Sequence, residues 1–594
     1  MKMLLTGNEA IARGVYESGC VLAAAYPGTP STEIMENIST QYKEIMSEWS
    51  PNEKVALETA FGGTMAGGRS FASMKHVGLN VAADPLFTIA YSGVNAGLVI
   101  VTADEPGQFS SQNEQDNRNY ARAAKIPMLE PSDSSEALAM TKLAFDISEM
   151  YDTPVLLRMT TRVCHSKSIV TLGERKVVAI KPYVKNAKKY VDVPVNAILR
   201  RAEVEKHMIA LKEYSETSTL NYVENNNSKI GVITSGMCLN YAKEVFATAV
   251  NYLKIGFSFP LPTEKINAFC KGLEKIYVIE ENDAFIEDEV RKLGYDCLGN
   301  NFFPVSGELT SDILRSCVNN KAIETIPFDK NKVVARPPAL CAGCPHRGFF
   351  YEISKRKDIV VSGDIGCYTL AFAPPYNAMD FNCCMGASIS AGNGFQKVIN
   401  MVEGNTKRVV SVLGDSTFFH SGMTSLLDVV YNNGNSINVI LDNRITGMTG
   451  HQENPGSGYN AQGDVAPITD IEALVKAIGI KHVTVIDPND LTAVNKALDD
   501  AISINEASVI ITRFPCVLKK MSIIDKSEFP QAFKDKCVVD TDKCVGCKLC
   551  LKCGCPALSV INKKAKIDAS MCVGCQVCKQ ICKVSAIKVG GNNL

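Results

Sequence analysis

The chain has 594 residues, of which 46% are hydrophobic and 21% are charged, and its formal net charge is −1 at pH 7. This composition is typical of a globular protein with several cores, and it argues against general nucleic-acid binding or membrane-surface binding. No apolar run reaches the roughly 18 residues of a membrane span, and the N-terminal apolar stretch is too short for a signal peptide. We therefore expect a cytoplasmic protein that binds neither nucleic acid nor membrane.

The first half of the chain predicts two α/β domains. Residues 1–175 alternate helix-like segments with short apolar runs, such as Gly97–Ala103 and Thr153–Met159, which are typical of buried parallel strands. Residues 176–227 are rich in Lys, Glu and Asn and predict a surface connection. Residues 228–325 begin with a strand and a glycine turn and continue through Lys275–Asn282, so they predict a smaller α/β domain. A polar, proline-ended linker follows at 329–338.

Residues 339–520 predict a third α/β domain, with strands at Val409–Leu413 and Ile437–Leu441. Asp415 and Asn443 follow these two strands, so both side chains are expected at the carboxyl edge of one sheet, where such folds bind ligands. A carboxylate and an amide oxygen suit Mg²⁺, and Gly414 allows a phosphate to approach the backbone. The alternative is an ordinary Gly-Asp turn in a Rossmann-like sheet.

The C-terminal tail holds ten of the 22 cysteines, between Cys537 and Cys582. Without an export signal, this density indicates metal binding, and two C-x2-C-x2-C runs fit iron–sulfur clusters better than zinc, which is the alternative. We predict a small α+β ferredoxin domain at 537–594 with two [4Fe–4S] clusters. Cys553 competes with Cys555 as one ligand, and we prefer Cys555 because Pro556 follows it. The predicted ligand sets are Cys544, Cys547, Cys550 and Cys582 for one cluster, and Cys555, Cys572, Cys575 and Cys578 for the other.

Several segments together carry a resemblance to a known family. Gly414-Asp415-Ser416, with Asn443 28 positions after the aspartate, resembles the thiamine diphosphate motif, although Ser416 stands where glycine is usual. The segments LCAGCPHR, GDIGCY and MGASISAGNG precede it, and ALETAFGGTMAGGRSF and KHVGLNVAADP lie near the N-terminus. Over nearly the whole chain, tail included, the sequence resembles the large (α) subunits of the indolepyruvate ferredoxin oxidoreductase family, which are thiamine-diphosphate-dependent 2-oxoacid:ferredoxin oxidoreductases.

The resemblance implies roles for residues of the third domain. Mg²⁺ would be bound by the side chains of Asp415 and Asn443 and by the Ile445 carbonyl. Cys341 and Cys344 would belong to the cofactor pocket, while a separate metal site at this C-x2-C pair is the alternative. The other implied cofactor-binding residues are Gly366, Cys367, Tyr368, Gly414 and Ser416.

The resemblance also implies that the N-terminal domain binds the pyrimidine ring. Glu58 would be the acid that hydrogen-bonds this ring and drives loss of the thiazolium C2 proton. It lies between apolar neighbours, so we expect it to be partly buried, and an exposed helix glutamate is the alternative. Thr29 is a candidate donor to the oxoacid carboxylate, and a helix start is its alternative. Lys75, His76 and Asn80 are further candidates for the pocket, and a structural role is the alternative for the histidine.

The implied reaction is oxidative decarboxylation of an aryl 2-oxoacid such as indolepyruvate, with coenzyme A as acyl acceptor and ferredoxin as electron acceptor. One domain of the related enzymes is missing here, so a separate small (β) subunit is expected, in a heterotetramer of two large and two small chains. A non-redox thiamine decarboxylase would not need eight cluster cysteines. A pure electron-transfer protein would not need about 500 residues of α/β sequence.

Overall fold

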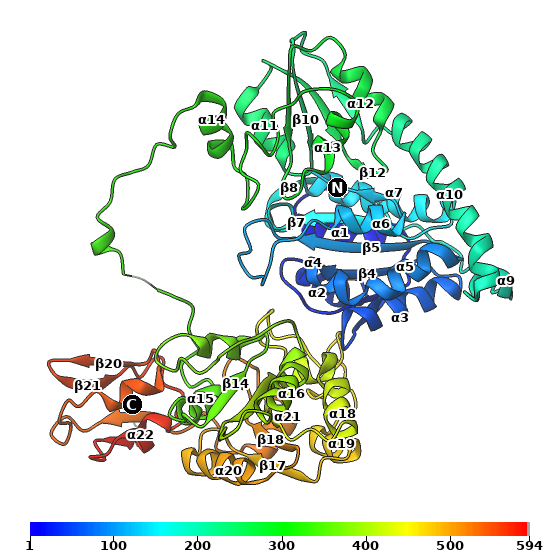
Figure 1. The fold of residues 1–594 in the computed structure, drawn as a ribbon. Helices are drawn as coiled ribbons and strands as arrows, with labels where there is room; N and C mark the ends of the chain where they lie inside the picture. The colour runs from blue at the N-terminus through cyan, green and yellow to red at the C-terminus, as the bar shows by residue number, and fades with distance from the viewer. Residues whose placement is uncertain (335, 591–594) are drawn as a thin grey trace. The chain divides into compact units, whose positions relative to one another are not determined.

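The structure, a computed structural model, describes residues 1–334 and 336–590. The chain forms two compact units, Met1–Phe328 and Asp329–Leu594, and the boundary falls at the start of the polar segment 329–338 (Figure 1). Among the described helices, none combines the length and apolar character that a membrane span requires.

The first unit is built on a seven-stranded sheet in the order β12-β6-β7-β5-β4-β2-β3. Its strands pair in parallel except β12, which is antiparallel to β6. The predicted strands at Gly97–Ala103 and Thr153–Met159 are confirmed as β5 and β7. The strands are β2 (Leu22–Ala25), β3 (Met46–Trp49), β4 (Ser70–Lys75), β5 (Leu98–Asp104), β6 (Met128–Leu129), β7 (Val155–Thr160) and β12 (Phe257–Phe259).

Helices cover both faces of this sheet because its strands are apolar on both sides. In β5, Val99 and Val101 pack into one core with α1, α2 and α7, whereas Leu98 and Ile100 pack into a second core with α3, α5 and α6. An antiparallel pair, β1 (Lys2–Thr6) and β8 (Lys167–Thr171), flanks the first core. The helices are α1 (Gly7–Glu17), α2 (Thr32–Gln41), α3 (Glu53–Met65), α4 (His76–Val81), α5 (Ala83–Ser92), α6 (Arg118–Ala124), α7 (Ser134–Tyr151) and α8 (Thr161–His165).

The segment predicted as a surface connection contains a 24-residue helix, α10 (Pro194–Thr217), after the short α9 (Ala187–Tyr190). It leads into a four-stranded sheet in the order β13-β10-β11-β9, whose edge strand β9 is antiparallel. The strand predicted at the start of this domain is confirmed as β10, and the segment Lys275–Asn282 contains β13. The elements are β9 (Tyr222–Glu224), β10 (Ile230–Ser235), β11 (Asn251–Ile255) and β13 (Lys275–Ile279), with α11 (Cys238–Phe246), α12 (Thr263–Cys270), α13 (Phe285–Lys292) and α14 (Ser311–Asn319).

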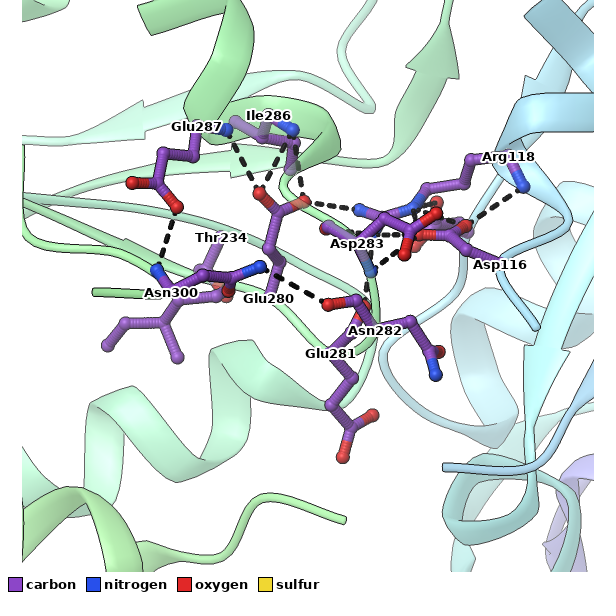
Figure 2. A network of polar contacts seen from close by, with 12 residues as sticks. Asp116, Arg118, Thr234, Glu280, Glu281, Asn282, Asp283, Ile286, Glu287 and Asn300 are labelled. Atoms are coloured by element: carbon purple, nitrogen blue, oxygen red, sulfur yellow. Dashed lines mark hydrogen bonds and ion pairs between the residues drawn. The ribbon is translucent and has the colours of Figure 1, made fainter. Parts of the chain in front are cut away.

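A buried network of charged side chains joins the two sheets of this unit (Figure 2). Arg118, at the start of α6, lies 2.6 Å from Asp116 and 2.5 Å from Glu280, which follows β13. Burial opposes ionisation of Asp116, but the guanidinium groups of Arg118 and Arg158 outweigh it and lower its pKa to about 2. Loss of one partner would leave a buried charge uncompensated, so the network holds these loops in place.

The second unit contains a five-stranded parallel sheet in the order β14-β15-β16-β18-β17. The two strands predicted here are confirmed as β15 and β16. The strands are β14 (Ile359–Ser362), β15 (Arg408–Gly414), β16 (Ile437–Asp442), β17 (His482–Ile486) and β18 (Ser508–Arg513). The helices are α15 (His346–Ile353), α16 (Ala387–Ile399), α17 (Asp415–Thr417), α18 (Met423–Tyr431), α19 (Ile471–Ile478), α20 (Leu491–Ser503) and α21 (Ile523–Glu528), and one π-helical turn (Phe418–Gly422) separates α17 from α18.

The cysteine-rich tail is a small α+β structure that packs against the same unit, in red and orange in Figure 1. Arg347 of α15 donates to the carbonyl oxygen of Cys553, and Gln580 donates to that of Asn489. The elements of the tail are β19 (Cys537–Val539) paired with β22 (Ile587–Val589), β20 (Leu558–Ile561) paired with β21 (Lys564–Ile567), and α22 (Val577–Ile581).

Candidate active site

The carboxyl edge of the second unit's sheet brings the predicted metal ligands onto adjacent strands. β15 and β16 are parallel neighbours, and Gly414 at the end of one pairs with Leu441 near the end of the other. Asp415 and Asn443 follow these strand ends and are buried, at 2% and 9% exposure. The Thr446 hydroxyl donates to the Ser416 hydroxyl over 3.0 Å, which ties the two loops together.

The electrostatics around Asp415 favour a cation. Burial raises the pKa of Asp415 to about 7, and the nearby Asp442 carboxylate adds to the rise. The Asn454 amide donates a hydrogen bond to Asp415 over 3.1 Å, and this bond lowers the pKa in part. Asp442 is itself paired with Arg513 at 2.8 Å. A buried carboxylate with amide and carbonyl oxygens beside it is a hard donor set of the kind that Mg²⁺ prefers. The residues present therefore fit a divalent cation.

The segment 364–368 packs closely against this edge. A Cβ at Gly366 or Gly414 would lie within 2.9 Å of a ring carbon of Tyr368, so glycine is required at both positions by close approach. The Tyr368 hydroxyl donates to the Ile365 carbonyl over 2.8 Å. Asp364 is buried and accepts from the backbone N–H groups of residues 386 and 388 at 2.8 and 2.9 Å.

Four thiols gather next to this edge. The backbone N–H of Cys516, which follows β18, donates to the Asn443 carbonyl over 3.0 Å. Burial raises the pKa of Cys367 to about 11, and the thiols of Cys516 and Cys341 add to that rise. Burial also raises the pKa of Cys344, with the thiols of Cys367 and Cys516 contributing. The C-x2-C pair therefore has two further thiols within electrostatic range of it.

In the first unit, Gly28, which precedes Thr29, lies close to Lys75 at the carboxyl end of β4. A Cβ at Gly28, beside Thr29, would meet the Lys75 side chain at 3.2 Å. Burial lowers the pKa of Lys75, whose ammonium donates to the Ser110 carbonyl over 3.2 Å and lies 3.9 Å from Glu105. His76 is buried, and burial lowers its pKa as well.

Glu58 is more exposed than the sequence predicted. The prediction that it is partly buried is wrong, because its side chain is 46% exposed on α3, where it pairs with Lys54 one turn earlier. Its neighbours Leu57 and Ala60 are buried, so Glu58 lies on the solvent-exposed side of the helix. Its catalytic role stays a prediction.

The tail contains two pockets lined by cysteines. Cys544, Cys547, Cys550 and Cys582 line the first, which we call the outer pocket. The N–H groups of Ala565 and Ala586 point at two of these sulfurs, at 3.4 and 3.3 Å. Such donors stabilise thiolates.

The second pocket, which we call the inner pocket, is lined by the other predicted set, Cys555, Cys572, Cys575 and Cys578. Cys553 and Cys537 also line it, and the Cys537 N–H donates to the Cys572 sulfur over 3.4 Å. Gly343 and Arg347 of the preceding domain complete the lining. Across the described ranges, no three His, Cys, Asp or Glu side chains are arranged to hold a single metal ion.

Part of each unit matches a known protein family. Residues 13–227 match the family "Pyruvate flavodoxin/ferredoxin oxidoreductase, thiamine diP-bdg", and residues 364–512 match "Thiamine pyrophosphate enzyme, C-terminal TPP binding domain". The indolepyruvate oxidoreductase subunits IorA of Methanothermobacter marburgensis and Methanothermobacter thermautotrophicus are 39% and 40% identical to this chain, over 99% of it and 98% of their own lengths. This chain belongs to the IorA family. A solved 2-oxoglutarate:ferredoxin oxidoreductase from Magnetococcus marinus is more distant, with a TM-score of 0.46 and 17% identity over 54% of this chain and 65% of that one.

Membership of the IorA family confirms the resemblance inferred from the motifs, and thiamine diphosphate binding follows from the two matched domains. The individual site residues remain predictions supported by their geometry. Three residues near these sites escaped sequence reasoning: Asn454, Cys516 and Cys537. Cys516 could have been noticed because it follows the apolar run Val509–Ile511, which forms part of β18 in the same sheet, whereas Asn454 lies in an irregular loop without a spacing signal.

Proposed function

We propose that this chain is the thiamine-bearing large subunit of an enzyme that oxidatively decarboxylates aryl 2-oxoacids such as indolepyruvate, with transfer of the acyl group to coenzyme A. The observation that carries the proposal is that one chain combines two thiamine-binding domains with two pockets lined by cysteines. In the reaction, the bond to the carboxylate breaks and CO₂ leaves, a thioester forms, and one proton and two electrons are released. The electrons pass singly to ferredoxin.

The residues of the second unit would hold the cofactor. Asp415, Asn443 and the Ile445 carbonyl would bind Mg²⁺, which neutralises the diphosphate. Thiamine diphosphate, when bound, supplies the carbon nucleophile for the 2-oxo carbon and the electron sink that lets CO₂ leave. Gly366, Tyr368 and Gly414 form the close backbone approach beside this site.

In the first unit, Glu58 would hold a proton at the aminopyrimidine ring, and Thr29 would orient the oxoacid carboxylate. The tail would act as a ferredoxin domain, with one [4Fe–4S] cluster in each pocket. A small subunit would complete the enzyme, since the relatives are themselves named as subunits.

The test is an anaerobic screen of 2-oxoacids with the chain co-expressed with its small subunit. Reduction of methyl viologen and formation of acyl-CoA would be measured for aryl, branched and unsubstituted 2-oxoacids. We expect the aryl substrates to give the highest kcat/KM. A preparation that holds thiamine diphosphate and iron but reduces the dye with none of these substrates would disprove the proposal.

A further inference from the structure

The two cysteine-lined pockets differ in what surrounds them. The inner pocket includes Gly343 and Arg347, which belong to the domain that carries the thiamine motif. The outer pocket is lined by tail residues alone, from Val539 to Ile587. Electrons that leave a cofactor in that domain would therefore meet a cluster in the inner pocket before one in the outer pocket.

The outer pocket opens to the surface. Cys547, one of its lining cysteines, is exposed. Val545 and Val584, which also line it, are 68% and 39% exposed. An apolar side chain that stays exposed beside a redox site is a feature of a surface that another protein covers.

Positive charge surrounds this opening. Lys548 lines the outer pocket and Lys583 lies between two lining residues, Cys582 and Val584. Lys543 precedes the lining Cys544, and the Lys563 carbonyl lies 2.1 Å from where a Cβ on the lining Gly546 would stand. All four lysines are exposed, and none forms an ion pair within residues 336–590. We call Lys543, Lys548, Lys563 and Lys583 the outer lysine patch.

The charge of the tail as a whole has the same sign. Residues 537–594 contain nine lysines and three aspartates, without arginine or glutamate, in a chain whose net charge is −1. Two oxidised clusters with their thiolates would add about two negative charges each, which leaves the tail positive. The remainder of the chain therefore carries a formal charge of −7, so the positive excess is confined to the tail.

We propose that the outer lysine patch is the docking surface for a small acidic iron–sulfur protein, which takes electrons from the outer pocket. This inference rests on the proposed function, because it assumes a cluster in that pocket. In each transfer one electron leaves the reduced outer cluster and enters the oxidised cluster of the partner, and no bond forms or breaks. Opposite charges would steer the partner, while Val545 and Val584 form the apolar centre of the contact.

The test uses the holoenzyme with its small subunit, saturated with 2-oxoacid and coenzyme A under anaerobic conditions. The variant is Lys543→Glu with Lys583→Glu, because these two lysines belong to the patch but do not themselves line the outer pocket. The matched control is Lys566→Glu, because Ala565 lines the outer pocket and the next residue of β21 points to the opposite face. Two acceptors are compared: a purified acidic two-cluster ferredoxin and methyl viologen, a small dication.

We expect the double variant to raise the KM for ferredoxin by about tenfold or more at low salt, and to lose the salt dependence that wild type shows. Methyl viologen reduction and the EPR spectrum of the reduced clusters should stay at wild-type levels, as should all parameters of the control. Unchanged ferredoxin kinetics in the double variant would overturn the proposal. The proposal would also be overturned if the double variant lost binding to a single-stranded oligonucleotide while its ferredoxin kinetics stayed at wild-type values, because the patch would then be a nucleic-acid-binding surface. Failure of the wild type to reduce viologen would instead refute the proposed function.

Discussion

Arg347 donates a hydrogen bond from Nη1 to the backbone carbonyl oxygen of Cys553, over 3.2 Å. The same guanidinium donates from Nε to the Cys341 carbonyl over 2.7 Å and from Nη2 to the Leu340 carbonyl. It is 1% exposed, and no carboxylate lies at ion-pair distance from it in the described part of the second unit. Arg347 therefore links the C-x2-C loop to the tail through backbone carbonyl oxygens, and it also donates to the Tyr376 hydroxyl over 3.1 Å.

Replacing Arg347 with methionine should loosen the tail. Two buried carbonyl oxygens and one partly buried carbonyl oxygen lose a charged donor. Each such bond contributes about 1.5–3 kcal/mol, so a loss of several kcal/mol is expected. The measurements are the thermal midpoint of the apoprotein and the rate of limited proteolysis in residues 521–536, which precede the tail and include α21. Arg315→Met is the matched control, since Arg315 forms ion pairs only at the surface and its loss should leave the thermal midpoint close to that of the wild type. Equal thermal midpoints and equal proteolysis rates in the two variants would contradict a linking role for Arg347.

The inner pocket offers Cys553 and Cys555 as competing ligands. Cys553 is 1% exposed, and its carbonyl is already held by Arg347 and by the Tyr376 hydroxyl. We expect wild-type protein to hold about eight iron atoms, and Cys578→Ala and Cys555→Ala to lose about four each while thiamine diphosphate stays bound. Cys553→Ala should keep all its iron.

Iron and acid-labile sulfide analysis checks these contents. Loss of iron from Cys553→Ala but not from Cys555→Ala would reverse the ligand assignment. A wild-type content near twelve, reduced by about four in Cys516→Ala, would assign a further cluster to Cys341, Cys344, Cys367 and Cys516.

Binding of Mg²⁺ and thiamine diphosphate should depend on the ionisation of Asp415. Burial raises the pKa of this carboxyl to about 7 in the absence of metal, above its ordinary value of about 4. In the apoprotein its contribution to stability is therefore present at low pH and is lost as pH rises through 7. The metal binds the ionised form, so affinity should fall by up to about tenfold per pH unit below 7.

The comparison variant is Asp415→Asn, which keeps the shape of the side chain and removes its charge. Cofactor affinity by calorimetry should be weak in this variant and should depend less steeply on pH than in the wild type. The apoprotein gives a second measurement, because the thermal midpoint of the variant should exceed that of the wild type at about pH 8 and match it near pH 4. Parallel pH profiles for the two apoproteins would exclude Asp415 as the titrating group.

The parts predicted well from the sequence are those set by local pattern. Asp415 and Asn443 directly follow apolar strands, so strand position alone brought them to one edge. The cysteine runs of the tail were sorted by spacing, and their two sets line separate pockets. The sequence was less informative where few residues are buried: α10 has only Val204, Leu211 and Ser215 in buried positions, so its helical period was hidden in polar sequence.

Contacts between residues far apart in the sequence explain some of the remaining differences between prediction and structure. β12 has three residues and joins β6 from about 130 positions away, a contact that no short-range pattern announces. The burial of Glu58 was misjudged because its apolar neighbours in sequence, Leu57 and Ala60, lie on another side of α3. In a helix, neighbours along the chain do not share a face, and only positions three or four apart do.

That exposure makes Glu58→Gln a clean test of the proton relay. The substitution removes a charge from an exposed helix position, so fold and thermal midpoint should change little. If Glu58 holds the proton at the aminopyrimidine, exchange of the thiazolium C2 proton should slow by about 100-fold or more, while thiamine diphosphate stays bound. Quenched-flow deuterium exchange followed by NMR measures this rate directly, without turnover.

Lys54→Met is the matched control, because it removes the partner of Glu58 at 2.5 Å but leaves the carboxylate, and its exchange rate should remain close to wild type. Wild-type exchange in Glu58→Gln would show that another acid serves the pyrimidine ring.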